Sequence, residues 1–266
     1  MANYTAADIK ALRERTGAGM MDVKKALDEA NGDAEKAIEI IRIKGLKGAT
    51  KREGRSTAEG LVAAKVDGGV GVMIEVNCET DFVAKADKFI QLADKVLTVA
   101  VESGAGDLDT LLATEVDGKP LSEVVVRRVA RIEGKTVDAY LHKTSKDLPA
   151  QVGVLFAVDG EGEAAATAAH DVAVHIAAMS PNYLSREDVP ADLVESERRI
   201  AEETAKAEGK PEAAMTKIVE GRVTGFYKGE VLLDQAFAKD AKKSVAQVLE
   251  EAGVKGSGFA RFRVGS

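Results

Sequence analysis

The residues best suited to act on another molecule form one short segment, Asn77 to Lys85, with the sequence NCETDFVAK. Upstream, Val70 to Val76 is short, apolar and rich in β-branched residues, which predicts a mostly buried strand. Downstream, apolar residues recur at helical spacing, which predicts an amphipathic helix from about Asp87 to Glu102. The segment therefore joins a strand to a helix as a loop, and it carries one aromatic residue, Phe82, among polar neighbours.

Phe82 has two interpretations. An aromatic side chain on a loop can anchor in a pocket of another protein, because it offers a large apolar surface and has only two χ angles to restrict. Alternatively, Phe82 folds back as a lid over its own core while Asp81 caps the following helix. The physics of the residues alone slightly favours the lid.

A second candidate is Met21, in a helix expected from about Met20 to Ala30. Met20, Val23 and Leu27 share one face of that helix, which predicts that this face is buried. Met21 lies about 100° round the helix from Met20. Two interpretations stay open for it: an adaptable apolar side chain exposed near the helix start, or a partly buried residue at the edge of the core.

A third candidate is His175, in a helix expected from roughly Glu163 to Met179. The histidine flanks the apolar stripe of this helix rather than lying in it, and Ser180-Pro181 ends the helix soon afterwards. This position predicts a packed, hydrogen-bonded side chain near the rim of the core.

Sequence signatures of catalysis and of bound metal are absent. Gly134-Lys135-Thr136 resembles the end of a phosphate-binding loop, but that pattern requires a glycine where Val129 stands. His142, His170 and His175 lack the paired spacing of metal ligands. No nucleophile elbow or Cys–His signature occurs. We therefore expect no cofactor and no metal, and a hydrolase that uses surface carboxylates is a weak alternative.

Composition describes a globular protein of more than one structural unit. The chain has 266 residues, more than one compact core usually holds, with 45% hydrophobic and 30% charged residues. The single cysteine, Cys78, excludes an internal disulfide and fits a reducing compartment. No apolar run approaches the roughly 18 residues of a membrane span, and no secretory leader pattern opens the chain. We expect a cytoplasmic protein without a membrane partner.

Residues 1–46 predict a module of three short helices around one small core. Thr5-Ala6-Ala7-Asp8 fits a capping box at the start of the first helix, and Asn31-Gly32 has the chemistry that ends the second. Residues 47–59 follow as a basic, glycine-containing linker. It acts as a solvated tether or, in the main rival interpretation, binds ribosomal RNA through Lys47 to Arg55. The net charge of -7 argues against nucleic-acid binding, which requires a basic face.

An internal duplication follows, with one half in residues 60–136 and the other in 137–190 together with 229–266. Each half has a β-hairpin followed by a helix. The strand sequences VGVMIEV (Val70 to Val76) and VGVLFAV (Val152 to Val158) match closely in pattern. Two such halves predict antiparallel sheets covered by helices on one face.

Residues 191–228 predict two helices joined by Gly209-Lys210-Pro211, which makes an antiparallel helical hairpin. Beyond it, the sequence predicts a strand at Val231 to Leu233, a helix near Ser244 to Glu251 and a strand at Phe259 to Val264. The expected fold class is α+β: an N-terminal three-helix module, a duplicated core of antiparallel sheets and helices, and a helical hairpin.

Several strings together resemble the bacterial elongation factor Ts family, the guanine-nucleotide exchange factors for elongation factor Tu. They are RERTGAGMMD at Arg13 to Asp22, NCETDFVAK at Asn77 to Lys85, HIAA at His175 to Ala178, and GKP at Gly209 to Pro211 followed by KIVEGR at Lys217 to Arg222. The likeness covers nearly the whole chain in the family's order. It implies a ubiquitin-associated-like N-terminal module and a coiled-coil protrusion formed by the helical hairpin.

The resemblance also implies the binding residues. Thr80, Asp81, Phe82 and Val83 match the family segment that enters beside the partner's magnesium site and dislodges the ion. Arg13, Met20 and Met21 match positions on the N-terminal module that contact the GTPase domain, and His175 matches a histidine that presses on the other side of the nucleotide pocket.

The activity that follows from the resemblance requires no chemistry of the chain's own. Elongation factor Tu is the implied partner, through its GTPase domain and beyond, with no direct binding of nucleotide or nucleic acid by this chain. Mg²⁺ bridges the nucleotide phosphates to a GTPase, so a segment that displaces it promotes release of GDP and lets GTP rebind. No bond is made or broken, so we expect an exchange factor and not an enzyme. Two departures are expected: the segment before Arg127 is short and lacks the Gly-Glu-Asn run common there, and the extra C-terminal helix that some members carry is not found.

Overall fold

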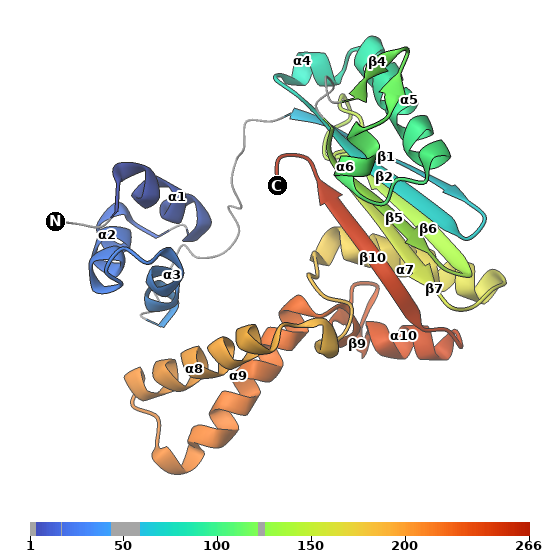
Figure 1. Ribbon diagram of the computed structural model, residues 1–266. Coiled ribbons are helices and arrows are strands. Elements are labelled where there is room, and N and C mark those ends of the chain that lie inside the picture. The colour runs from blue at the N-terminus through green and yellow to red at the C-terminus, as the bar shows by residue number, and fades with distance from the viewer. Residues whose placement is uncertain (1–3, 17, 44–58, 122–125) are drawn as a thin grey trace. The chain divides into compact units, whose positions relative to one another are not determined.

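The computed structural model describes residues 4–16, 18–43, 59–121 and 126–266 (Figure 1). Most of the predicted linker at 47–59 and part of the short segment before Arg127 lie outside these residues. The chain divides into two units, Met1–Arg55 with Glu187–Tyr227, and Ser56–Arg186 with Lys228–Ser266. Helices and antiparallel sheets occur together, which confirms the predicted α+β class.

The N-terminal helices are α1 (Ala6–Thr16), α2 (Met20–Glu29) and α3 (Ala34–Ile43), and they enclose one small apolar core. The predicted capping box is confirmed: the Asp8 N–H donates to Thr5 Oγ1 at 3.3 Å, and the Thr5 N–H donates to the Asp8 carboxylate at 2.6 Å. These bonds satisfy two backbone donors that a helix start leaves without partners.

Met20 does not lie on the buried face of α2. The buried residues of this helix are Val23, Ala26 and Leu27, whereas the Met20 side chain is 57% exposed, so the predicted burial of Met20 is wrong. Ala18, in the turn before α2, is buried in the same core as Val23 and Leu27. Met20 and Met21, at the start of α2, therefore face solvent, whereas Val23 faces the core.

The predicted helical hairpin consists of α8 (Ala191–Ala207), the short η3 (Glu212–Ala214) and α9 (Met215–Glu230). A local apolar cluster holds the two long helices together, formed by Ala201, Ala205, Met215, Val219 and Val223. In the same unit, the Arg42 guanidinium of α3 donates to both carboxylate oxygens of Glu197 of α8, at 2.6 and 2.8 Å.

The second unit contains two three-stranded antiparallel sheets. The first sheet has the order β1-β2-β5, from β1 (Glu59–Asp67), β2 (Val70–Cys78) and β5 (Val126–Glu133). The second has the order β10-β7-β6, from β6 (Thr136–His142), β7 (Val152–Val158) and β10 (Gly256–Arg263). The two predicted hairpins are thus confirmed, and each contributes two neighbouring strands to its sheet.

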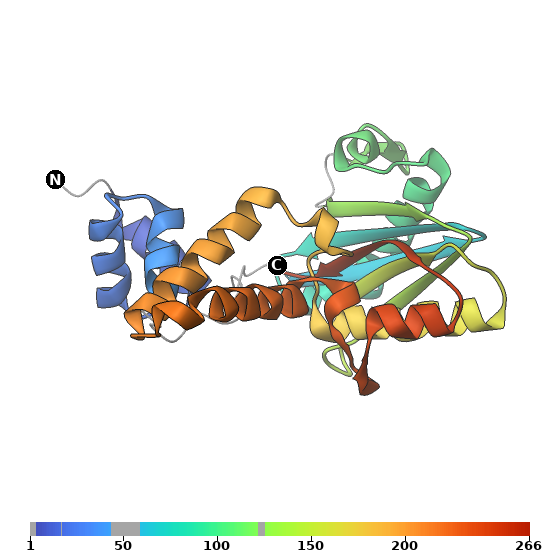
Figure 2. The ribbon, with the colours of Figure 1, turned by 90° about the horizontal axis from the view of Figure 1, so that it is seen from below.

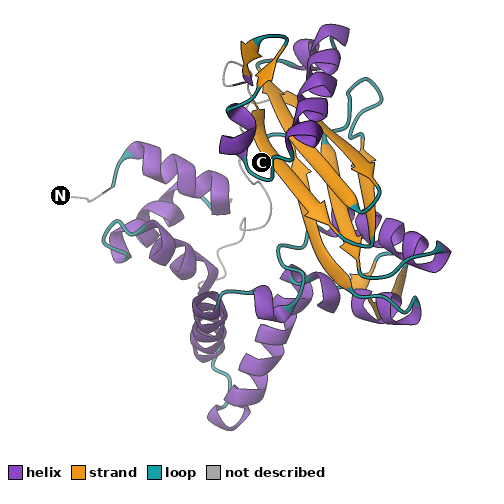
Figure 3. Ribbon diagram, turned by 45° about the vertical axis from the view of Figure 1, so that its right-hand side comes forward, coloured by secondary structure: helices purple, strands orange, loops and turns teal. Residues whose placement is uncertain are grey.

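The sheets pack face to face, and a long helix covers the outer face of each. Helix α5 (Asp87–Ser103) packs on the first sheet and α7 (Glu163–Met179) on the second (Figure 2). An apolar layer of Val62, Met73, Leu155 and Phe262 separates the two sheets. The result is four layers, helix–sheet–sheet–helix, in which both central layers are strands (Figure 3).

Two glycines permit the close approach of the sheets, and they occupy matching positions in the duplicated strands. A Cβ added to Gly153 would lie 2.4 Å from Val62 Cγ1 and 2.7 Å from Met73 Sδ. A Cβ added to Gly71 would lie 2.8 Å from Val137 Cγ1 and 3.0 Å from Leu155 Cδ2. Each sheet therefore places a large side chain, two residues after its own glycine, over the glycine of the other sheet.

A charged side chain is fully buried among the described residues of this unit. Glu75 of β2 is 0% exposed, and its carboxylate accepts a hydrogen bond from Arg128 Nε of β5 at 2.7 Å. Arg128 also donates to the Arg263 carbonyl at 2.9 Å, and its guanidinium lies 4.7 Å from the centre of the Phe262 ring. The arginine therefore links the two sheets as well as neutralising Glu75.

The remaining elements are short, and one departs from prediction. They are α6 (Leu108–Leu112), β3 (Glu115–Val116), β4 (Lys119–Pro120), η2 (Arg186–Asp188), η4 (Leu232–Asp234), β8 (Ala236–Phe237), β9 (Asp240–Ser244) and α10 (Val245–Glu251). The helix expected near Ser244 to Glu251 is confirmed as α10. The strand expected at Val231 to Leu233 is wrong: only Val231 forms a single bridge, to Tyr183, and the chain then turns into η4, where the Gln235 N–H donates to the Val231 carbonyl.

Candidate partner-binding surface

The segment after β2 is a one-turn helix, α4 (Asp81–Ala84), and not the expected loop. Thr80 has an extended backbone, with φ −143° and ψ 156°, and its hydroxyl oxygen accepts the Val83 N–H at 3.3 Å. Thr80 is therefore the cap of this turn. The expectation that Asp81 caps the following helix is wrong, because Asp81 already lies inside α4, and α5 begins only at Asp87 with Ala86 before it.

Phe82 projects away from the core. Its side chain is 80% exposed, and that of the neighbouring Val83 is 43% exposed. Ala84, on the opposite side of the turn, is 0% exposed and holds α4 against the protein. The lid interpretation of Phe82 is therefore wrong, since a lid would bury the ring.

An ion pair braces the exposed turn. Lys85 Nζ donates to the Asp81 carboxylate at 2.9 Å, and the same ammonium lies 5.7 Å from the centre of the Phe82 ring. The hydrogen bond from Lys85 lowers the pKa of Asp81 and raises the pKa of Lys85, so both groups are charged at neutral pH. Lys85 was not among the predicted binding residues. The i, i+4 spacing of Asp81 and Lys85 could have indicated it, had the turn been predicted as helical.

The free thiol beside this turn is not activated as a nucleophile. Cys78 Sγ donates to the Thr80 carbonyl at 3.3 Å, and burial raises the pKa of the Cys78 thiol. The thiol therefore stays protonated at neutral pH and helps to position Thr80.

The other unit carries its own exposed apolar residues. Met20 and Met21, in the first turn of α2, are 57% and 63% exposed, and Arg13 of α1 is exposed as well. The exposed interpretation of Met21 is confirmed. Two adjacent exposed methionines form an apolar surface that adapts its shape through flexible, unbranched side chains.

His175 lies inside the core and not at its rim. Its ring is 1% exposed, is stacked on Phe237 with 5.8 Å between ring centres, and makes two hydrogen bonds. The Ala238 N–H donates to Nδ1 at 3.1 Å, so the proton is on Nε2, which donates to Gln235 Oε1 at 2.8 Å. Burial lowers the pKa of His175, with a smaller opposing effect of the Gln235 hydrogen bond. The predicted hydrogen-bonded side chain is confirmed, but its predicted rim position is wrong, because residues about 60 positions later cover it.

The described residues contain no group of three or more His, Cys, Asp or Glu side chains able to hold a metal ion. Among the helices in the part of the chain that the structure describes, none has the length and apolar character needed to cross a membrane. The exposed apolar side chains on α4 and α2 are the candidate surfaces for binding another protein.

Comparison with known proteins gives consistent results along the whole chain. The family model described as Elongation factor TS matches residues 79–266, which include α4 and His175. The proteins named Elongation factor Ts from Arthrobacter sp. (strain FB24), Pseudarthrobacter chlorophenolicus and Micrococcus luteus are 91%, 89% and 71% identical to this chain. Each alignment covers 100% of this chain and 100% of the relative.

Proposed function

The chain belongs to the elongation factor Ts family of translation elongation factors, which exchange the nucleotide of elongation factor Tu, and we propose that it promotes GDP release by disturbing the magnesium and phosphate site of that partner. GTP then rebinds to the emptied site. In this proposal the chain acts in the cytoplasm and makes or breaks no covalent bond.

The exposed ring of Phe82 is the observation that carries the proposal. An aromatic side chain that is 80% exposed on a capped, ion-paired turn gains nothing from the chain's own core. Large exposed apolar side chains of this kind mark surfaces that bind other proteins. Because the turn is already fixed, little conformational entropy is lost when the ring enters a pocket of the partner.

We assign to Thr80, Asp81, Phe82 and Val83 the displacement of Mg²⁺ from the partner. The ion bridges the phosphates to the GTPase and neutralises their charge, so its displacement weakens nucleotide binding. The segment binds best to the metal-free pocket, so binding of the segment and binding of nucleotide oppose each other. By thermodynamic linkage, the segment weakens nucleotide binding by the same free energy by which bound nucleotide weakens binding of the segment. The exchange factor therefore needs differential binding and no catalytic dyad.

Further contacts are proposed for the other candidate residues. Residues 1–46 act as a module whose Arg13, Met20 and Met21 contact the GTPase domain. His175 acts from the other side of the nucleotide pocket. Because its ring is 1% exposed and covered by Gln235 to Ala238, direct contact requires that this covering segment move.

The test is the rate of fluorescent GDP release from elongation factor Tu, with and without the chain. The intact chain should accelerate release, and Phe82→Ala should make the stimulated release about 30- to 1,000-fold slower, as expected for loss of an aromatic anchor. Phe82→Leu, which keeps an apolar side chain, should retain more of the activity. The melting temperature of both variants should stay close to that of the parent chain, because only a small part of the ring is buried.

Absence of any acceleration by the intact chain would overturn the proposed function. If the Phe82→Ala variant is folded and accelerates GDP release normally, the chain is an exchange factor that acts through residues other than Phe82.

A further inference from the structure

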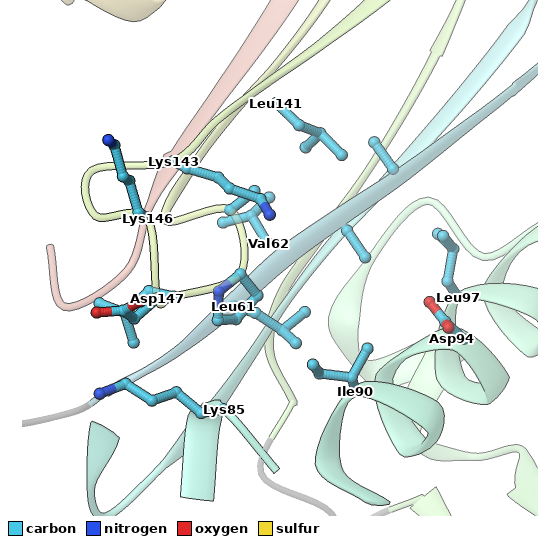
Figure 4. Close-up of a pocket in the computed structure, with 15 residues that line it drawn as sticks. Leu61, Val62, Lys85, Ile90, Asp94, Leu97, Leu141, Lys143, Lys146 and Asp147 are labelled. Atoms are coloured by element: carbon cyan, nitrogen blue, oxygen red, sulfur yellow. The ribbon is translucent and has the colours of Figure 1, made fainter. Parts of the chain in front are cut away.

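The pocket of about 490 Å³ between α5, β1 and the loop that joins β6 to β7 is balanced in charge (Figure 4). Its charged lining residues are Lys85, Lys143, Lys146, Asp94 and Asp147. Lys85 is already paired with Asp81, so the ammonium groups here are matched by carboxylates and the lining does not select a partner of either charge. A contact in which each charge has one defined partner lies in the other unit, between α3 and α8.

Helices α3 and α8 meet through two ion pairs that are also direct hydrogen bonds. The Arg42 guanidinium of α3 donates to both carboxylate oxygens of Glu197 of α8, at 2.6 and 2.8 Å. In the second pair the donor comes from α8: Arg199 donates to the Glu39 carboxylate of α3 at 2.5 Å. The Ser196 hydroxyl donates to the same carboxylate at 2.9 Å. We call these five side chains the α3–α8 contact.

The pairing of charges fixes how the two helices lie against each other. Each helix contributes one acid and one base, and the acid of each helix pairs with the base of the other. An exchange of partners would place Glu39 against Glu197 and Arg42 against Arg199, and like charges repel. The forked pair of Arg42 and Glu197 also fixes the orientation of both side chains, because it uses two N–H groups and two oxygens. The contact therefore favours one register of α3 on α8.

Part of the α3–α8 contact is buried. Glu197 is 7% exposed. Burial alone would raise the pKa of Glu39, but the hydrogen bonds from Arg199 and Ser196 outweigh it and lower the pKa, so this carboxylate is charged at neutral pH. Ile200, three residues after Glu197 and so on the same side of α8, is also 7% exposed. Exposed ion pairs hold helices together weakly, whereas a hydrogen-bonded pair with a buried member is costly to break.

The contact leaves the proposed binding face of the N-terminal module uncovered. Arg13 of α1 and both Met20 and Met21 of α2 are exposed while α3 is held against α8. An inhibitory contact would cover these side chains. Since α1, α2 and α3 share one apolar core, holding α3 also fixes the helix that carries the methionines. The geometry is therefore that of a support for the binding face.

We propose that the side chains of the α3–α8 contact are positioning residues, which hold the N-terminal module on the helical hairpin and so present Met20 and Met21 to elongation factor Tu in one orientation. The inference rests on the proposed function and extends it. A module that is fixed before binding loses less freedom of motion when it binds, so the contact increases affinity. It does not act on the exchange step, because none of its side chains is assigned to the nucleotide site.

The experiment measures binding of the full chain to nucleotide-free elongation factor Tu by calorimetric titration. Glu197→Ala removes the forked pair and should raise Kd about three- to tenfold, as expected when a fixed binding element is freed. The charge-swapped chain Arg42→Glu/Glu197→Arg should regain most of the lost affinity, because opposite charges again face each other. Glu202→Ala is the matched control within α8: it removes an exposed pair with Lys206 and should change Kd less than about twofold.

Two further readouts separate positioning from a merely structural role. GDP release at saturating concentrations of Glu197→Ala should stay near that of the parent chain, since only affinity depends on the contact. In a chain that already carries Met20→Ala/Met21→Ala, the Glu197→Ala change should raise Kd less than about twofold, because the apolar surface that the contact presents has been removed.

The outcomes distinguish the inference from the proposed function. The inference is wrong, and the proposed function stands, if Glu197→Ala binds like Glu202→Ala, if the charge swap restores no affinity, or if the effect of Glu197→Ala is the same with and without the two methionines. Tighter binding by Glu197→Ala would also overturn it, since the contact would then restrain the module. If the intact chain neither binds elongation factor Tu nor accelerates GDP release, the proposed function fails, and the inference fails with it.

Discussion

The close approach of the two sheets at Gly153 can be tested by adding one methyl group. In Gly153→Ala the new Cβ would lie 2.4 Å from Val62 Cγ1 and 2.7 Å from Met73 Sδ, well inside the roughly 3.5–4.0 Å of normal carbon contacts. Overpacking of this kind costs about 1–3 kcal/mol, and the loss of chain entropy on replacing glycine recovers about 0.4–1 kcal/mol. We expect a net loss of about 1–2 kcal/mol.

Thermal and urea unfolding of matched variants measure this loss. For a unit of this size the expected fall in melting temperature is roughly 2–8 °C. Gly258→Ala in β10 is the control, because a Cβ there meets nothing within 4 Å, and it should not lower the stability. In a double-mutant cycle, Val62→Ala removes the nearest methyl group, so Gly153→Ala should be less destabilising in that background by at least about 0.5 kcal/mol. Equal stabilities for the two glycine variants, or strict additivity in the cycle, would refute the reasoning.

Three other predictions concern buried charge, pH and the exposed methionine. Arg128→Met leaves the fully buried Glu75 without its counter-charge and should lower the free energy of unfolding by about 3–5 kcal/mol in urea titrations, unless Glu75→Gln is present as well. Burial lowers the pKa of His175 below its usual value of 6.5, so the neutral ring stabilises the fold fully above pH 6.5, and this stabilisation is lost as the pH falls further. His175→Gln should therefore remove this part of the pH dependence of the free energy of unfolding in urea. The control variant His170→Gln, at an exposed histidine, should not remove it. Met21→Ala should weaken binding to elongation factor Tu in calorimetry without changing the melting temperature, since the side chain is 63% exposed.

The regular elements of the fold could be predicted because their causes are local. The apolar, β-branched content that marks β2, the apolar stripes of α5 and α7, and the capping box at Thr5 each depend on residues within a few positions of one another. The match of VGVMIEV with VGVLFAV also predicted two similar hairpins. It did not predict that the two glycines would lie against each other's sheets, because that contact depends on tertiary packing.

The wrong predictions concern residues whose burial or backbone conformation depends on contacts outside their own helix or strand. His175 is buried by Gln235 and Phe237, which its own helix cannot reveal. Met20 is exposed although helical spacing places it with Val23 and Leu27, whereas Ala18, before the helix, is buried in the core of the module. The apolar residues at Val231 to Leu233 are buried to different degrees without forming a strand, since burial alone does not fix the backbone conformation.

The sequence predicted where in the chain the candidate binding segment lies, but not that it forms a helical turn with an exposed ring. The sequence placed Phe82 between a strand and a helix, and left open whether the ring pointed inward. The deciding residues are its neighbours: Ala84 is small enough to be fully buried, Thr80 caps the turn, and Lys85 pairs with Asp81. Every one of these contacts stabilises the backbone of α4, and none of them buries the ring. The exposed ring therefore supports the proposed function, in which a pocket of elongation factor Tu receives it.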